Sequence, residues 1–290
     1  MLLYIRFNNF YSFAEQAELS FKVGKQAAPS LYDIHLKTAQ DELRLNKVAA
    51  VLGANGSGKT QLLKVIPFIS WFIVSSARTL SADDEIYFEA FTTKENQSSN
   101  FEVGFTLKNE QGIDEEFRYE VTMTSKNVQR EALYQKTSRS FSYIFERTHQ
   151  DELKNYKHRS FLAPALADDV NDNVSLLAYA FLLDNPIAVR VIQFFSQMTF
   201  NLHTAGRRDS SDADLYRMAE LFSKRASLKQ QAEQLLCQFD TGISKINFAP
   251  VIMVDENKKQ KEVLMPMGVH QHDGESLEFL FTDESNGTRS

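Results

Sequence analysis

The sequence of 290 residues contains one cysteine, Cys237, and no long uninterrupted apolar run. A single cysteine excludes an internal disulfide framework and a zinc site built on several cysteines. The most apolar stretch, residues 62–77, is interrupted by Lys64 and Pro67 and is shorter than the roughly 20 residues of a membrane-spanning helix. The first residues lack the charged, apolar and small-residue regions of a secretory signal. We therefore expect a cytoplasmic protein without a membrane segment.

A surplus of positive charge is also lacking, because the formal net charge is −6. A surface that attracts nucleic acid over its whole extent is therefore not expected. Residues 126–159 carry more Lys and Arg than Asp and Glu, which indicates either a local nucleic-acid surface or a solvated face of a sheet. With 43% hydrophobic residues, the chain can bury a sizeable core in one or two domains.

Hydrophobic periodicity predicts an order of elements that mixes strands and helices. Residues 48–52 are wholly apolar and predict a strand buried on both faces, whereas residues 22–46 are expected to form a loop with room for one short element. Helical spacing begins near Gln61, and residues 212–239 carry one apolar stripe at helical spacing. Period-two alternation predicts strands at residues 3–7, 17–21, 101–107, 117–123, 128–134, 143–145, 243–248, 251–254, 263–267 and 277–281. The strands between residues 101 and 146 are expected to form an antiparallel meander, followed by helices at 174–183 and 187–198.

The strongest motif is a glycine-rich loop between the apolar run and the first predicted helix. It matches G-x-x-x-x-G-K-[ST], and its glycines allow consecutive N–H groups to point at phosphate oxygens at a helix N-terminus. Lys59 is expected to reach the β- and γ-phosphates, and the Thr60 hydroxyl is expected to bind Mg²⁺. The alternative is a glycine-rich turn with a solvated lysine. The predicted nucleotide ligands are Gly53, Asn55, Gly56, Ser57, Gly58, Lys59 and Thr60.

The N-terminal segment adds a resemblance to a known family. Residues 7–13, Phe-Asn-Asn-Phe-Tyr-Ser-Phe, and the following Leu-Ser-Phe at 19–21 resemble the opening strands of ABC-like and SMC-like ATPases. More specifically, the chain is similar to the prokaryotic AAA-family ATP-binding proteins of the RloA and abortive-infection type. Tyr11 stands where members of that family usually carry Arg or Lys. The resemblance covers essentially the whole chain, including segments similar to the family's β insertion and helical part at 100–105, 117–119, 130–134, 144–147 and 173–177.

Residues 283–290, Asp-Glu-Ser-Asn-Gly-Thr-Arg-Ser, resemble the E-S-x-G-T signature that opens a helix in these proteins. In ABC-type ATPases two domains pair head to tail, and the signature Ser and Gly of one domain face the γ-phosphate held by the other. The resemblance thus implies that Ser285 and Gly287 act in trans and that Ser285 joins Lys59 as a catalytic residue. An ordinary polar helix N-cap is the alternative.

The resemblance implies an α/β fold, namely a P-loop NTPase nucleotide-binding lobe of ABC/SMC type with an antiparallel β insertion and a helical insertion. The expected domains are residues 1–95 for the ATPase lobe with the P-loop, 96–150 for the β insertion, 151–242 for the helical insertion and 243–290 for return strands and the signature. The implied cofactors are ATP and Mg²⁺. ATP-driven dimerisation and hydrolysis would switch a phage-defence system of the abortive-infection type, as a homodimer or higher oligomer with a nuclease or another effector as partner.

Several alternatives stay open at this level. In ABC-like ATPases the Mg²⁺-linked Asp, the catalytic Glu and the switch His follow the signature, and the sequence stops at Ser290, so a non-hydrolysing nucleotide-binding or scaffold module is the rival. Residues 251–256 have a Walker B form, but a charged turn and another apolar strand follow, which favours a β-hairpin over chemistry by Asp255 and Glu256. A GTPase is disfavoured because no N-K-x-D motif is present, and a kinase because no phosphoacceptor site can be located.

Two further groups of polar residues are candidates for ligand binding. His270 and His272 beside Asp273 form either a metal pair or a solvated strand end. The second group comprises His203, Arg207 and Arg208. These residues either contact phosphate or nucleic acid, or they belong to a loop of solvated charges.

Overall fold

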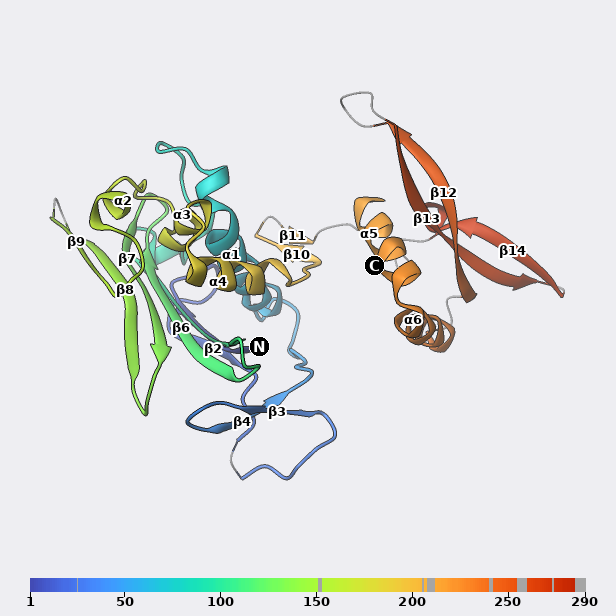
Figure 1. The fold of residues 1–290 in the computed structure, drawn as a ribbon, viewed down its shortest axis with the longest axis horizontal. Coiled ribbons are helices and arrows are strands. Elements are labelled where there is room, and N and C mark those ends of the chain that lie inside the picture. The colour runs from blue at the N-terminus through green and yellow to red at the C-terminus, as the bar shows by residue number, and fades with distance from the viewer. Residues whose placement is uncertain are drawn as a thin grey trace. The chain divides into compact units, whose positions relative to one another are not determined.

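The computed structural model describes residues 1–24, 26–150, 153–204, 206–207, 212–239, 242–254, 260–272 and 274–284. The chain divides into two compact units, residues 1–206 and residues 207–290. Each unit has a hydrophobic core of its own, and Figure 1 labels the elements that build them.

The first unit is built on one antiparallel sheet of seven strands. The strands are β1 (Leu2–Asn8), β2 (Ala17–Ser20), β5 (Ser99–Lys108), β6 (Asp114–Met123), β7 (Val128–Lys136), β8 (Phe141–Gln150) and β9 (Leu153–His158). Their order is β2-β1-β5-β6-β7-β8-β9. The predicted meander and the two N-terminal strands are therefore confirmed, and the pairing of β1 with β5 joins them into one sheet.

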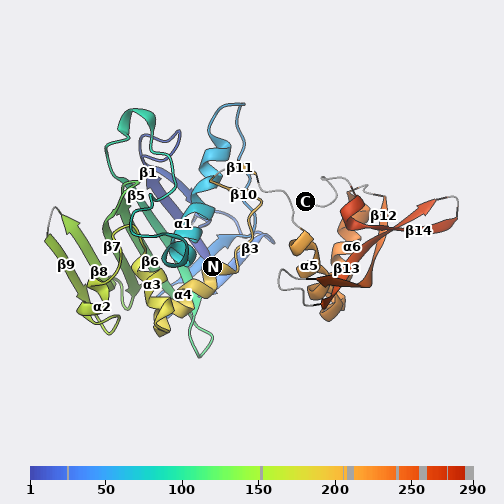
Figure 2. The same cartoon turned by 90° about the horizontal axis from the view of Figure 1, so that it is seen from above.

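Helices cover one face of this sheet (Figure 2). The predicted helix after the glycine-rich loop is confirmed as α1 (Lys59–Thr79). It buries Val65, Phe68, Ile69, Phe72 and Ile73, whose spacing of three and four residues places them on one side of the helix. The break predicted at Asn185-Pro186 is also present, because Asn185 caps the helix that begins with the proline. The other elements here are η1 (Thr92–Lys94), α2 (Pro164–Asp168), α3 (Leu176–Leu182) and α4 (Pro186–Ser196).

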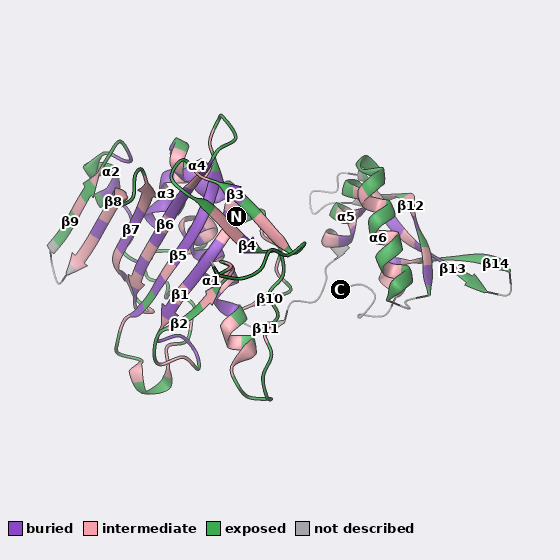
Figure 3. Ribbon diagram, turned by 90° about the horizontal axis from the view of Figure 1, so that it is seen from below, coloured by how far each residue is buried: buried purple, intermediate pink, exposed green. Residues whose placement is uncertain are grey.

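By length and apolar composition alone, helix α1 could cross a membrane, and so could the bent pair of α3 and α4 taken together. Their buried side chains form one cluster with side chains of the sheet. This packing is that of core helices, and Figure 3 shows many buried residues along strands β1, β5 and β6.

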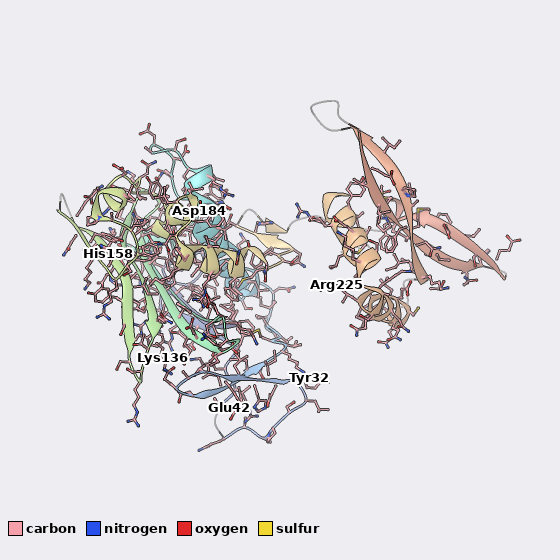
Figure 4. All side chains as sticks on the ribbon, in the orientation of Figure 1. Tyr32, Glu42, Lys136, His158, Asp184 and Arg225 are labelled. Carbon is pink, nitrogen blue, oxygen red and sulfur yellow. The ribbon has the colours of Figure 1, made fainter. Side chains whose placement is uncertain are left out.

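A hairpin that the sequence did not predict lies between β2 and the glycine-rich loop. It consists of β3 (Asp33–Lys37) and β4 (Glu42–Asn46), and its Leu36 and Leu45 pack on Leu3 and Tyr4 of β1. Lys136 of β7, labelled in Figure 4, also ties the hairpin to the sheet, because its Nζ lies 2.6 Å from Asp41 and 2.7 Å from Glu116. The strands are short and mostly polar, which is why periodicity did not separate them from a loop.

The prediction of a strand at residues 48–52 is wrong. The segment is not a strand, and Val48 and Leu52 are 72% and 90% exposed. A strand buried on both faces needs neighbouring strands at its edges and layers above and below it. Among the described residues nothing pairs with this segment, and the last backbone bond before it joins the amide of Lys47 to the carbonyl of Tyr32.

A buried charged network connects the sheet to α3. Glu131 of β7 is fully buried and accepts hydrogen bonds from Tyr119, from Ser175 at the start of α3 and from the amide of Leu176. Its other bonds come from Arg147, which also donates to the carbonyl of Val174. Burial raises the pKa of Tyr119 well above its ordinary value, so this phenol stays a donor. The carboxylate thus fixes the N-terminus of α3 against the middle of the sheet.

The second unit combines α5 (Asp212–Lys224) and α6 (Ala226–Gln238) with a sheet of β12 (Ile243–Val254), β13 (Gln260–His272) and β14 (Glu275–Leu280). Its core contains Leu215, Ile243, Ile246 and Phe281, the last from η2 (Phe281–Asp283). The stripe predicted over residues 212–239 is divided between two helices, which meet at Arg225 (Figure 4). The predicted hairpin is confirmed, because β12 and β13 pair up to Val254 and Gln260.

The four domains drawn from the sequence stay a prediction. In the structure, α2 to α4 belong to the first compact unit, whereas α5 and α6 belong to the same unit as β12 to β14.

We predict that Glu131→Gln lowers the free energy of unfolding by about 3–5 kcal/mol, because it leaves the buried Arg147 guanidinium without its carboxylate. Urea denaturation measures the change. Glu18→Gln is the control, because it removes an exposed ion pair with Arg6, and its cost is expected to stay below about 1 kcal/mol. Equal costs for the two variants would contradict the role given to the network.

Candidate functional site

The glycine-rich loop ends in a helix N-terminus without any capping side chain. Gly56 and Gly58 have φ angles of 79° and 86°, in the left-handed region that glycine adopts without steric cost. Gly58 is the N-cap of α1, and its first turn contains no acidic residue. The first helical bond runs from the amide of Leu62 to the carbonyl of Gly58 at 2.8 Å. The amides of residues 58–61 therefore lie before the first hydrogen bond of the helix and take no part in that bonding.

These amides form a site suited to an anion. N–H groups at a helix N-terminus without acceptors, together with the helix dipole, attract negative charge. Among the described residues no side chain caps them, and none of their amides has a backbone acceptor. The loop is exposed to solvent from Gly53 to Ser57, so a phosphate group can reach the amides.

Lys59 places its ammonium group across the loop. Its Nζ donates to the carbonyl oxygens of Gly53 and Ala54 at 2.8 and 2.7 Å. Gly53 fits closely, because a Cβ there would lie 2.7 Å from Oγ of Ser57. The lysine is thus held by neutral carbonyl oxygens, which phosphate oxygens can replace with stronger charge-assisted bonds.

The turn after β1 supports the loop from the side. A Cβ at Gly58 would lie 2.9 Å from Oγ of Ser12 and 3.5 Å from the ring of Phe13. The turn is fixed by Asn9, which is buried and donates to the carbonyl oxygens of Lys94 and Gln97 while it accepts from the amide of Phe91. The N-terminal segment that carries the family resemblance therefore packs directly on the glycine-rich loop.

Aromatic packing sets the position of α1 behind the loop. The rings of Phe10, Phe68 and Phe101 contact one another with centroids 5.2 to 5.5 Å apart. They come from the turn, from α1 and from β5, and all three are buried. This cluster holds the start of α1 next to the turn and to the sheet.

Thr60 is the residue that the sequence assigned to Mg²⁺, and it is exposed in the first turn of α1. Among the described residues no group of three His, Cys, Asp or Glu side chains could hold a metal ion. Mg²⁺ commonly uses one or two protein oxygens together with phosphates and water. Thr60 beside the amide site fits this pattern, whereas a metal site made by the protein alone does not.

Several predicted site residues lie outside the described residues, namely Ser285, Gly287, Asp255, Glu256, Asp273 and Arg208. Their roles stay predictions.

Among the candidate histidines, the structure gives contacts for His270 and His203. The Nε2 atom of His270 lies 2.7 Å from Oε1 of Glu284, and its ring packs edge-on against Phe279. His203 lines a cavity of about 470 Å³ with the aromatic rings of Phe68, Trp71 and Phe200, and no residue of the glycine-rich loop takes part in the lining.

The basic character of residues 126–159 is largely neutralised in the structure. Arg130, Lys136 and Arg147 form ion pairs with carboxylates of neighbouring strands, and so does Lys157 near the sheet edge. Lys154 pairs with Asp172 in the turn before α3. Paired cations are less available to a phosphate backbone, so this surface supports the solvated-face interpretation.

Two residues beside the loop were not predicted from the sequence as site residues. Asn9 was considered only as part of the segment 7–13, although its amide holds the turn that supports Gly58. Lys64 was treated as an interruption of an apolar stretch, yet its side chain is buried on α1 with its Nζ above the ring of Tyr11. A lysine within the buried face of a predicted helix was the available signal.

Fold and loop together define a P-loop nucleotide-binding protein of mixed α/β architecture. Residues 48–290 match the family described as "AAA domain, putative AbiEii toxin, Type IV TA system". The chain therefore belongs to this family, whose AAA domains are nucleotide-binding ATPases. No curated protein matches the chain.

We predict that Gly58→Ala weakens the binding of MgATP, because the new methyl group presses on Ser12 and the left-handed backbone costs about 1–2 kcal/mol for a residue other than glycine. Calorimetric titration measures the affinity. Gly112→Ala is a matched control, since φ is 78° and nothing lies within 4 Å of a Cβ there. The prediction is wrong if the two variants bind MgATP equally well.

Proposed function

We propose that this chain binds ATP with Mg²⁺ at residues 53–60. The observation that carries this proposal is the start of α1, where uncapped amides, Lys59 and Thr60 converge next to two glycines of positive φ. This set matches the ligands that a triphosphate with one divalent cation requires.

Each residue has a separate task in this proposal. The amides of residues 58–61 hold phosphate oxygens, and Lys59 exchanges the carbonyl oxygens of Gly53 and Ala54 for the β- and γ-phosphates. Thr60 offers its hydroxyl to Mg²⁺, which supplies charge neutralisation between the β- and γ-phosphates when it is bound. The packing of Ser12 and Phe13 on Gly58 keeps the amides, Lys59 and Thr60 in fixed positions relative to one another.

We further propose the ABC/SMC type of domain and an ATP-dependent dimer. Support comes from the antiparallel sheet that places the N-terminal strands beside the loop, and from the signature-like sequence around Ser285. Two nucleotides held between protomers favour a closed dimer to the extent that they bind it better than the open form. In this proposal Ser285 and Gly287 of one protomer contribute to the γ-phosphate site of the other.

The biological role that we propose is a switch in a phage-defence system of the abortive-infection type, driven by ATP binding and slow hydrolysis. It rests on the family description, which names an abortive-infection toxin. A nuclease or another effector is the partner class in this proposal. A non-hydrolysing module is the rival, and turnover by the purified chain separates the two.

We predict that Lys59→Ala weakens MgATP binding by about 10- to 150-fold, the effect of losing a hydrogen bond to a charged group. Calorimetric titration against the wild type tests this. Lys47→Ala is the control, because its Nζ also donates to a backbone carbonyl, that of Leu31, and its loss should leave the affinity unchanged. MgATP binding by Lys59→Ala that is as tight as that of the wild type would contradict the proposal. So would a wild-type chain that does not bind MgATP.

We predict that MgATP promotes self-association and that Ser285→Arg abolishes this effect without lowering the affinity of the P-loop. A bulky cation at the signature blocks the trans contact, whereas the loop itself is untouched. Analytical ultracentrifugation with and without MgATP measures the association. Dimers that form equally well in Ser285→Arg, together with turnover linear in protein concentration, would argue against the trans site.

A further inference from the structure

We propose that Lys64 is a second cation of the nucleotide site and contacts the γ-phosphate. The inference rests on the proposed ATP binding at residues 53–60 and adds a ligand from the second turn of α1. Its starting point is a lysine side chain on α1 that is 9% exposed and for whose ammonium the described residues supply no carboxylate.

Lys64 is exceptional among the buried charges. Among the described residues two cationic side chains are buried, Lys64 with 9% exposure and Arg147 with 3%. Arg147 forms an ion pair with Glu131, as buried charges usually do. No carboxylate or carbonyl of the described residues bonds the ammonium of Lys64, which instead lies 4.3 Å from the centre of the Tyr11 ring.

The ring beneath this ammonium is fixed on three sides. The amide of Tyr11 donates to the carbonyl of Glu89 at 2.7 Å, and its hydroxyl donates to the carbonyl of Thr204 at 3.0 Å. Its ring also contacts Phe10 with centroids 4.7 Å apart. Burial raises the pKa of Tyr11 to about 12, so the phenol stays neutral and keeps its hydrogen bond. A cation–π contact of this kind orients an ammonium group without neutralising it.

Two geometric relations direct Lys64 toward the start of α1, where the proposal places the phosphates. It lies four residues after Thr60 on α1, so the two side chains share one face of the helix. Helical side chains lean toward the N-terminus, which directs the long lysine stem back toward the first turn. In addition, Tyr11 directly precedes Ser12, whose Oγ lies 2.9 Å from a Cβ built at Gly58.

The side on which Lys64 lies indicates which phosphate it contacts. Thr60 would hold Mg²⁺, which would offset the negative charge of the phosphates. A cation one turn further along the same face of α1 would approach the nucleotide from the side of Thr60, and the γ-phosphate is the charged group that ATP has and ADP lacks. Because Tyr11 compensates the ammonium only partly, a phosphate oxygen would give it a charge-assisted bond that the described residues do not supply.

Calorimetric titration of the full chain with MgATP and with MgADP tests the proposal. We expect Lys64→Gln to weaken MgATP binding by about tenfold, the effect of one charge-assisted bond, and MgADP binding by less than about twofold. Lys64→Arg should restore most of the preference for ATP. Lys64→Met keeps the apolar stem in place and serves as the second uncharged variant if Lys64→Gln folds poorly.

Lys22→Gln is the matched control, because its Nζ also lies over a tyrosine ring, that of Tyr4, at 5.0 Å. It should change neither affinity. An unaltered ratio of ATP to ADP affinity in both uncharged variants would overturn the proposal, and so would an equal loss for both nucleotides. Failure of the proposed function looks different, since neither the wild type nor any variant would then bind MgATP in a way that depends on Lys59.

Discussion

The contact among Phe10, Phe68 and Phe101 determines where α1 begins relative to the sheet. Through it, the turn after β1, the helix and strand β5 are locked together within one buried cluster. Aromatic side chains bury a large area and favour edge-on and tilted arrangements, so such a cluster tolerates little sliding. The uncapped amides at the start of α1 are therefore held in one place beside the turn.

Charge balance follows from this placement. A helix start with no acidic residue and no capping side chain leaves its partial positive charge for a ligand. Among the described residues, Lys59 is compensated by carbonyl oxygens and Lys64 by an aromatic ring. Elsewhere in the first unit, cations such as Arg147 and Lys136 are matched by carboxylates. The contrast separates the cations that stabilise the fold from those that we propose to bind the nucleotide.

Much of the site could be predicted from sequence because the P-loop is a local motif whose spacing carries its own chemistry. The long strands β5 to β8 were also predictable, since each alternates over many residues. Predictions failed where the outcome depends on distant partners. Residues 48–52 have strand character, yet nothing among the described residues pairs with them. Likewise, the role of Lys64 depends on Tyr11, which is far away in the sequence.

The central claim is that the amides at the start of α1 are phosphate ligands. Hydrogen–deuterium exchange over residues 56–62, with and without saturating MgATP, tests this claim most directly. We predict that exchange in this segment slows markedly with MgATP, because the amides of residues 58–61 gain acceptors that the described residues do not supply. Exchange in this segment that is the same with and without MgATP would contradict it.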